Sequence, residues 1–264
     1  MKIFLYTLIL LVVVACGSNS KQEAKNDSVE LSGEKIKPSD LDKLMLDIDF
    51  QTPNLVRVES LTYLKSDGSM MVVTAFLDQN ELITKIVEEY ADVSKNIRAR
   101  TEFYSNGGVL FATRKQSEKV KDNQAYFSDE VSFYDEEGNV KSSKERIADF
   151  EEDIENASYV KINNVAHSNE LAMQVLNQKG QFVTTFQGFV EQSGYQFLIV
   201  GEDVKGDGFT SSLSIQEDDK TILYLKREGK KVLGKELKVD FEKITDQQGY
   251  KIQILKSVAL VERI

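Results

Sequence analysis

Hydrophobic and polar residues alternate along much of the chain, and short polar turns interrupt the alternation. Four segments share one layout, in which an aromatic residue with a hydrophobic neighbour precedes a turn rich in Asp, Asn or Gly and an aliphatic restart. They are residues 62–72 (TYLKSDGSMMV), 75–86 (AFLDQNELITKI), 102–112 (EFYSNGGVLFA) and 132–142 (SFYDEEGNVKS). Because Asn and Gly accept positive φ, and successive strand residues face opposite sides, each segment predicts a β-hairpin. Together they predict an antiparallel meander that ends near residue 144.

Helical spacing replaces the alternation at three places. Ser39 stands before a short apolar stripe with Asp42 at the capping-box offset, which predicts a first helix. Residues 144–158 place apolar side chains on one helical face and an acidic run on the other, which predicts a second helix with a solvated acidic side. A third helix is predicted over residues 169–178, between a serine cap and a glycine stop.

Strand patterns return after residue 180. The predicted strands are residues 181–192, 195–201, 211–216, 221–227, 235–243 and 251–261. The clearest pattern is KELKVDFEK, in which Leu237, Val239 and Phe241 alternate with charged residues. Five or six short strands in a segment of this length predict a small closed barrel, and the OB fold is the commonest match to that size.

An apolar run opens the chain. Met1 and Lys2 precede thirteen largely apolar residues that end at Ala15. This run is short for a bilayer span, which needs about 20 residues, and it is typical of a secretory signal peptide. The letters VVAC at 13–16 resemble the lipobox of bacterial lipoproteins. That resemblance implies cleavage before Cys16, acylation of its thiol and amino group, and stable attachment to a membrane by two or three acyl chains. The alternative is a buried core cysteine behind an ordinary signal peptide.

Residues 16–40 are polar and show no apolar period, so they cannot bury enough surface to fold. A flexible tether of this length has a root-mean-square reach of about 25 to 30 Å. Gly17, rather than aspartate, follows the cysteine, which resembles the outer-membrane destination of lipoproteins in Gram-negative bacteria.

The expected fold class is α+β, mostly antiparallel β. We predict a signal peptide (1–15), a tether (16–40), a β-meander domain with a flanking helix (41–162) and a helix with a small OB-like barrel (163–264). The polar stretch 163–168 is the predicted boundary between the two folded parts.

The amino-acid composition limits the kinds of catalytic and metal site that the chain can form. Cys16 is the only cysteine and His167 the only histidine of the 264 residues. Once lipid occupies the cysteine, no thiol remains for a disulfide, a zinc ligand or a nucleophile, and a multi-histidine metal site is excluded. His167 lies in a polar segment beside a helix start, where a solvated side chain is expected. We therefore predict no cofactor, no metal and no catalytic residue.

The formal net charge is −10, although basic residues outnumber acidic ones after residue 219. A general nucleic-acid-binding surface needs a net positive face, so no nucleic-acid partner is expected. The basic C-terminal segment permits docking on the acidic part, contact with an anionic surface, or a plain solvated strand face.

Two family resemblances extend this interpretation. The hairpins are similar to repeat modules of the type tyrosine-x-asparagine-glycine-x-leucine in exported bacterial proteins, although the second and fourth segments depart from that pattern. A meander followed by a barrel on a lipid anchor also resembles the envelope-stress lipoprotein family that signals surface adhesion. That family carries paired cysteines in its mature chain, and this sequence has none, so its metal chemistry is not carried over.

Tyr63, Tyr104 and Tyr134 take similar places in three hairpins. If the neighbouring phenylalanines line the core, alternation puts the tyrosines in a row on the other face, where they predict a partner site. A helix over that row would make it a second core layer instead. The sequence thus predicts a lipid-anchored envelope protein that binds an unknown protein or small ligand and is not an enzyme. The alternative is a hydrolase of envelope glycans that uses two of the 43 acidic residues.

Overall fold

The structure is a computed structural model that describes residues 37–95, 97–121, 124–202, 207–245, 249 and 251–261. The predicted signal peptide, the lipidation site Cys16 and the predicted tether up to residue 36 lie outside the described residues. None of the helices in the described part is both long and apolar enough to span a membrane.

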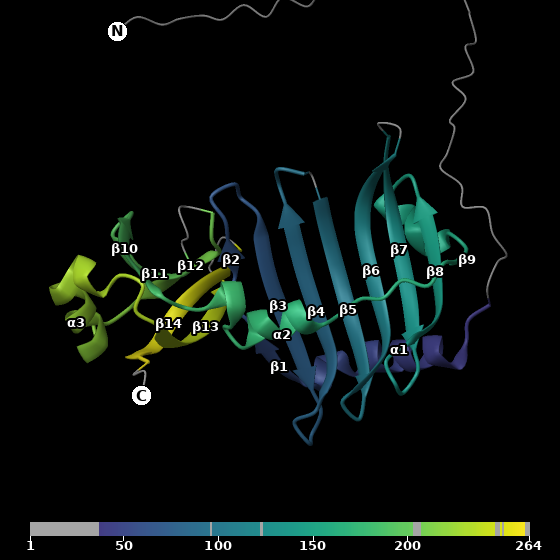
Figure 1. Ribbon diagram of the computed structural model, residues 1–264, viewed down its shortest axis with the longest axis horizontal. Helices are drawn as coiled ribbons and strands as arrows, with labels where there is room; N and C mark the ends of the chain where they lie inside the picture. Colours follow the sequence, from purple (N-terminus) through teal and green to yellow (C-terminus); the bar gives the residue numbers. More distant parts are fainter. Residues whose placement is uncertain are drawn as a thin grey trace, which may run out of the picture.

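The protein belongs to the α+β class, and antiparallel β-structure predominates, as predicted. Its N-terminal part is a meander that forms the broad sheet in Figure 1. The strands are β1 (Val56–Glu59), β2 (Tyr63–Leu64), β3 (Met70–Leu77), β4 (Ile83–Asp92), β5 (Ile97–Asn106), β6 (Val109–Lys121), β7 (Gln124–Tyr134), β8 (Val140–Ala148) and β9 (Val160–Ile162). Each strand from β2 to β9 pairs with the next, and β1 pairs with β3. The four predicted hairpins are confirmed as β2–β3, β3–β4, β5–β6 and β7–β8.

The hairpin turns carry the residues that such turns require. Gly107 and Gly108 between β5 and β6 have φ angles of 58° and 81°, which other residues rarely adopt. Between β3 and β4, the Asp78 carboxylate accepts hydrogen bonds from two backbone N–H groups further along the turn. Asp135 does the same between β7 and β8. These local bonds are the reason that the sequence pattern predicts the turns.

The predicted helix over residues 144–158 is wrong. Strand β8 continues to Ala148, and only Glu151–Asn156 form a helical segment, the 3-10 helix η2. Of the expected apolar face, Ile154 is buried but Phe150 is 61% exposed. The ladder between β7 and β8 satisfies the backbone groups of this segment, and that pairing outweighs the local helical spacing. The acidic run at the start of η2 is exposed to solvent, as expected.

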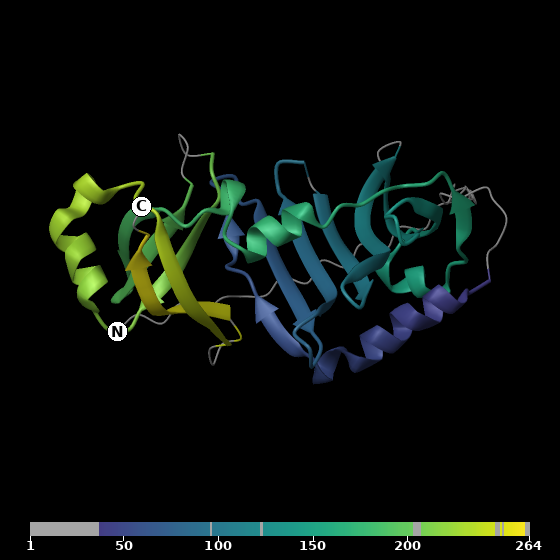
Figure 2. The same cartoon turned by 60° about the horizontal axis from the view of Figure 1, so that its bottom comes forward.

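Helix α1 (Asp40–Gln51), continued by the 3-10 helix η1 (Thr52–Asn54), crosses one face of the meander, as Figures 1 and 2 show. It begins with the predicted capping box: the Ser39 hydroxyl accepts a hydrogen bond from the Asp42 N–H, and the Asp42 carboxylate accepts one from the Ser39 N–H. The inner side of α1 packs on β5, β6 and β7 in an apolar cluster. Its buried members are Met45, Ile48, Tyr104, Phe111, Ala112, Val131 and Phe133.

The segment that leaves β9 runs along the opposite face of the meander, on the other side from α1 (Figure 2). It contains α2 (Glu170–Leu176) and the 3-10 helix η3 (Gly180–Phe182). The predicted third helix is therefore confirmed. At its start the Ser168 hydroxyl accepts a hydrogen bond from the N–H of Glu170. The meander is thus covered on both faces, by a different element on each.

As far as the structure describes it, the C-terminal part contains five strands, one α-helix and one 3-10 helix. Its elements are β10 (Phe186–Gln192), β11 (Tyr195–Gly201), β12 (Thr210–Ile215), α3 (Lys220–Glu228), the 3-10 helix η4 (Gly229–Val232), β13 (Leu237–Thr245) and β14 (Lys251–Leu260). β10, β11 and β12 pair antiparallel in that order, and β13 pairs antiparallel with β14. β14 meets β12 in a parallel contact at Ser214 and Ile254. A bridge between Thr185 and Glu236 joins the approaches to β10 and β13.

The predicted strand over residues 221–227 is wrong, because this segment is helix α3. The Asp219 carboxylate caps the helix by accepting a hydrogen bond from the N–H of Ile222. Ile222 and Leu225 are fully buried on one helical side, whereas Leu223 is 54% exposed. The letters TILYL fit a strand and a helix equally well, and the aspartate cap decides for the helix.

The two parts meet where Leu64 of β2 pairs with Thr210 of β12. Through this contact, fourteen strands of the described residues belong to one hydrogen-bonded sheet. The Tyr63 hydroxyl donates to the Phe182 carbonyl at 2.8 Å, and the ring centroids are 5.0 Å apart. The larger apolar core lies here and draws residues from both sides of the predicted boundary at 163–168. They include Leu61, Tyr63, Met71, Val73, Ile86, Phe103, Ala172, Val175, Phe182, Phe186, Leu198, Leu213, Ile222 and Leu225.

Candidate functional site

Both faces of the meander are covered where the candidate tyrosines lie, and the predicted tyrosine-lined partner site is wrong. Tyr63 and Tyr104 are fully buried, and Tyr134 is 6% exposed. Tyr104 lies under α1, where its hydroxyl donates to the Glu102 carboxylate at 2.6 Å. The Tyr134 hydroxyl accepts a hydrogen bond from the N–H of His167 in the segment after β9. Tyr63 lies in the larger apolar core, Tyr104 lies under α1 and Tyr134 lies against the segment after β9, so the three rings form no row.

His167 is not the solvated side chain that the sequence predicts. Its Nε2 lies 2.6 Å from Oε1 of Glu130 on β7, and its side chain is 17% exposed. Burial raises the pKa of Glu130, but the hydrogen bond and the charge of His167 outweigh burial and hold this pKa below its usual value. The contact fastens the segment after β9 to the sheet.

Two adjoining hollows lie on the α1 face of the meander, beside the helix. The first has a volume of about 650 Å³ and extends over β4 to β7 as far as η2. The second has a volume of about 440 Å³ and is bounded by β1, β3, β11, β12, β13 and β14. They share the lining residues Leu64, Met70 and Glu89, and we call the two together the junction groove.

Strand alternation places the groove side chains. On β3, Met71 and Val73 point into the larger core, so Met70, Val72 and Thr74 lie on the opposite face and line the groove. The same alternation continues across the meander, where Val72 pairs with Glu89 and Glu89 with Arg100. The groove is therefore the part of the α1 face that the helix leaves uncovered.

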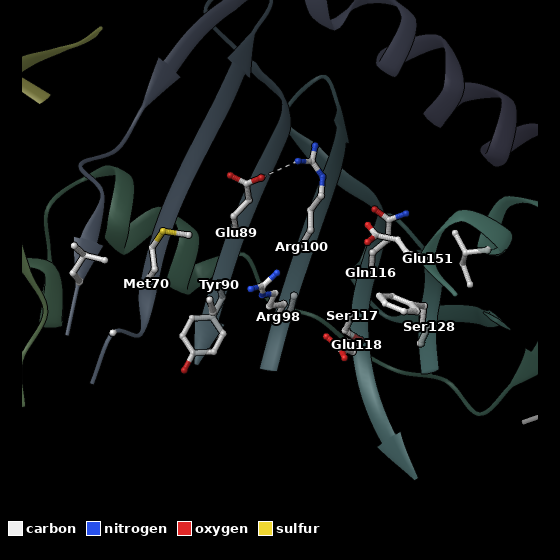
Figure 3. Close-up of a pocket in the computed structure, with 16 residues that line it drawn as sticks. Met70, Glu89, Tyr90, Arg98, Arg100, Gln116, Ser117, Glu118, Ser128 and Glu151 are labelled. Atoms are coloured by element: carbon white, nitrogen blue, oxygen red, sulfur yellow. Dashed lines mark hydrogen bonds and ion pairs between the residues drawn. The ribbon is translucent and has the colours of Figure 1, made fainter. Parts of the chain in front are cut away.

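Paired charges form the floor of the first hollow. Figure 3 shows Glu89 and Arg100 leaning toward each other, where Oε1 and Nη1 are 3.1 Å apart. The Arg100 guanidinium also contacts Glu102 at 2.8 Å, so this cation links the groove to the ion pairs under α1. Phe127 and Ile154 add apolar surface at the end of the hollow toward η2.

Buried ion pairs hold α1 to the sheet. The Lys85 side chain is 6% exposed and contacts Glu102 at 3.0 Å as well as Asp49 of α1. Lys144 pairs with Asp42 at the start of the same helix. Burial raises the pKa of Glu102, but the charge of Lys85 and the hydrogen bond from the Tyr104 hydroxyl are among the contacts that outweigh it, and this pKa lies below its usual value.

A second group of charges, the Asp129 cluster, lies further along the same face. Asp129 is fully buried and accepts hydrogen bonds from Arg114, Arg146 and Tyr159 at 2.8 to 2.9 Å. Both guanidinium groups also contact Glu155 of η2. Burial raises the pKa of Asp129, but these donors outweigh it and hold the pKa below its usual value.

A half-buried glutamine forms part of the wall of the second hollow. The Gln253 side chain accepts a hydrogen bond from the N–H of Thr62 at 2.7 Å and donates to the Ser211 hydroxyl at 2.9 Å. It thereby fixes β14 against the approach to β2 and against β12. Arg57, Lys243 and other polar residues line the same hollow.

The carboxylates that suit acid and base chemistry lie elsewhere. Burial raises the pKa of Glu88, whereas that of Glu130 is lowered, and such opposed shifts are what a general acid and a base require. Both lie on the face opposite to the groove, on strands three places apart. At about 4.8 Å per strand their backbones are about 14 Å apart, and the charge of His167 acts on both carboxyl groups. Among the described residues, no group of three His, Cys, Asp or Glu residues is placed to hold a metal ion.

Comparison with known proteins returned no matching family model, no matching curated protein and no matching solved structure. The groove residues were missed by the sequence-based predictions. Arg57 stands nearly the whole folded chain away from Lys243 and Lys251, which belong to one hairpin, and the three residues form no local motif. The only available signal was the basic excess after residue 219, and it does not indicate which lysines converge.

Proposed function

We propose that this chain is a lipid-anchored protein of the bacterial cell envelope that binds a ligand or a partner segment in the junction groove and catalyses no reaction. The observation that carries the binding role is the groove itself. Ligand sites are concave, combine apolar walls with a few placed polar groups and often lie where two parts of a fold meet. The junction groove has all three properties.

The anchoring half of the proposal rests on the lipobox-like VVAC at 13–16. A tether with a reach of about 25 to 30 Å would hold the folded part clear of the lipid headgroups. Gly17 favours the outer membrane in a cell with two membranes. The net negative charge continues to argue against nucleic acid as a partner.

The connectivity of the C-terminal strands supports an OB-like barrel within this proposal. The pairing order β10, β11, β12, β14, β13 returns to β10 through the Thr185–Glu236 bridge, and α3 lies between β12 and β13. A five-stranded Greek-key barrel has such a closed order and is used widely as a binding module. The second hollow includes residues of β11 and β12 from this barrel.

Cys16→Ser tests the anchor. The native protein should enter the detergent phase after phase separation, with its signal removed. The variant should stay in the aqueous fraction or keep its signal, because its only acylation site is gone. Ser18→Ala, which keeps the cysteine, is the matched control and should behave like the native protein. Cleavage and detergent partitioning of Cys16→Ser would contradict the anchor.

Thr74→Trp tests the groove. Alternation directs residue 74 into the second hollow, so an indole there should displace whatever binds. Native mass spectrometry of protein extracted from membranes should show a bound mass that Thr74→Trp loses and Gln192→Trp, at an exposed end of β10, retains. Retention of the bound mass by Thr74→Trp would contradict the groove as the site. Turnover of envelope glycan by the purified native protein would instead favour the hydrolase.

A further inference from the structure

Three cations gather in the second hollow, although the chain as a whole has a formal net charge of −10. Arg57 comes from β1, Lys243 from β13 and Lys251 from β14. In the β13–β14 ladder, Lys243 lies opposite Gln253, whose side chain bonds to the approach to β2. This register turns the basic face of the hairpin toward β1 and β2.

The positive charge of this hollow is incompletely balanced. Its two carboxylates are each engaged by an arginine, Glu59 by Arg57 at 2.7 Å and Glu89 by Arg100 at 3.1 Å. Within the part of the chain that the structure describes, Lys243 and Lys251 make no hydrogen bond or ion pair through their ammonium groups.

The surroundings of Lys243 lower the pKa of its ammonium group. Burial lowers its pKa, the Glu59 carboxylate offsets part of that effect, and the charges of Lys251 and Arg57 lower the pKa further. An anion placed among these groups would attract all three cations and favour the charged form of Lys243. The hollow is therefore arranged for a negative group that none of the described residues supplies.

Much of the remaining wall is apolar. Leu64, Met70, Val72, Phe197 and Ile252 line the same hollow, and Leu64 is 45% exposed. A small inorganic anion would leave this surface in water, whereas a ligand with a hydrocarbon part would cover it, at about 25 cal/mol per Å² of apolar area. Met70 and Leu64 also line the first hollow, which offers room for a longer body.

We infer that the second hollow binds an organic anion with an apolar body. Its carboxylate or phosphate contacts Lys243, Lys251 and Arg57, and its hydrocarbon part lies along Phe197 and Met70 toward the first hollow. This inference rests on the proposed function and deepens it by naming the class of ligand.

Decanoate is the probe, with decyl phosphate, decanol and decyltrimethylammonium as companions of equal chain length. Calorimetric titration of the purified, unlipidated chain should show saturable binding of one or both anions. Decanol and the cationic analogue should bind at least about tenfold more weakly, because they forgo charge-assisted hydrogen bonds to the lysines. Comparing the two anions separates a carboxylate ligand from a phosphate ligand.

Lys243→Gln should weaken binding of the preferred anion at least about tenfold. Lys238→Gln is the matched control, because Lys238 lies on the same strand, is exposed and lines neither hollow. The melting temperature of ligand-free Lys243→Gln should equal or exceed that of the native chain, because the substitution removes a desolvated and repelled charge. Such a result shows that lost binding is not unfolding.

Equal affinity for decanol and decanoate, equal weakening by the two lysine substitutions, or no binding of either anion would overturn the inference. These failures are distinct from failure of the proposed function. If Thr74→Trp still removes a bound mass while decanoate does not bind, only the ligand class is wrong. If Thr74→Trp removes nothing, the groove itself is wrong.

Discussion

The two apolar clusters of the molecule have different surroundings. The junction core, which contains Tyr63, Phe103 and Phe182, packs aromatic and aliphatic groups from two parts of the chain against each other. The cluster under α1 is smaller, and it is flanked by buried charges such as Lys85 and Asp129. On β5, for example, Phe103 packs in the junction core, whereas Glu102 on the other face belongs to the ion pairs under α1.

The difference follows from what covers each face. At the junction, α2, η3 and the C-terminal strands form a thick apolar layer on the sheet. On the other face, α1 is a single helix and covers only part of the width, so the sheet beside it must tolerate water. Buried ion pairs cost desolvation and add little net stability, but they strongly disfavour arrangements that leave one partner unpaired. The junction core should therefore supply stability, and the ion pairs should fix where α1 lies.

Phe182→Ala should have the largest effect, a loss of about 3 to 5 kcal/mol in the free energy of unfolding, because it opens a cavity in the junction core. Phe182 is fully buried and contacts the rings of Tyr63 and Phe209. Urea unfolding followed by circular dichroism measures the loss. Phe150→Ala, at a site that is 61% exposed, is the control and should change stability little. Similar losses for both would contradict a stabilising junction core.

Asp129→Ala should cost about 3 kcal/mol, because it leaves two guanidinium groups with only part of their compensation. Arg114 and Arg146 are 18% and 8% exposed, and Glu155 remains their one other carboxylate in the cluster. The same urea experiment applies, with exposed Glu151→Ala as the control. A loss no larger than that of the control would mean that the Asp129 cluster is water-filled and loosely held.

Acid should remove the contribution of the Asp129 cluster and spare that of the junction core. The pKa of Asp129 is held below its ordinary value of 3.8, so its contribution to stability is present above that pH and is lost as the pH falls through the lower folded pKa. Asp129→Asn should therefore destabilise the chain less at pH 3 than at pH 7. The difference between the native chain and Phe182→Ala should change little over the same interval. If the effects of Asp129→Asn and Phe182→Ala changed with pH to the same extent, the loss of stability in acid could not be assigned to the Asp129 cluster.

Ser39→Ala should have the smallest effect, about 1 kcal/mol, because it removes the hydroxyl of the capping box from an exposed helix start. Ser39→Thr keeps a hydroxyl and should retain most of the stability. Hydrogen exchange should report the loss in α1 amides and leave the β3–β4 ladder unchanged. Faster exchange in both would show that α1 and the sheet open as one unit.

Local signals made part of this fold predictable. The capping box at Ser39, the aspartate and glycine turns and the alternation in β13 are each complete within a few residues, and each was read correctly. The errors at 144–158 and 221–227 concern segments whose letters fit two structures. In the first, pairing with β7 decided for a strand, and in the second, the Asp219 cap decided for a helix.

The site was less predictable than the fold. Tyr63, Tyr104 and Tyr134 were recognised as a set, but their burial depends on α1 and on the segment after β9, which no hairpin pattern reveals. The groove depends on a contact between β2 and β12, about 150 residues apart in the chain, and such long-range pairing leaves no periodic trace in one sequence.

Helix α1 also has a mechanical consequence. It is the first helix after the predicted tether, so in a protein held by its N-terminal lipid any pull from the membrane arrives at Ser39. The load then meets the contact between Asp42 and Lys144 before it meets that between Asp49 and Lys85 further along the helix. The helix would peel from the sheet one contact at a time, while the strands beneath it keep their ladders. An anchored molecule of this design would yield at its charged helix interface first and preserve the junction groove under tension.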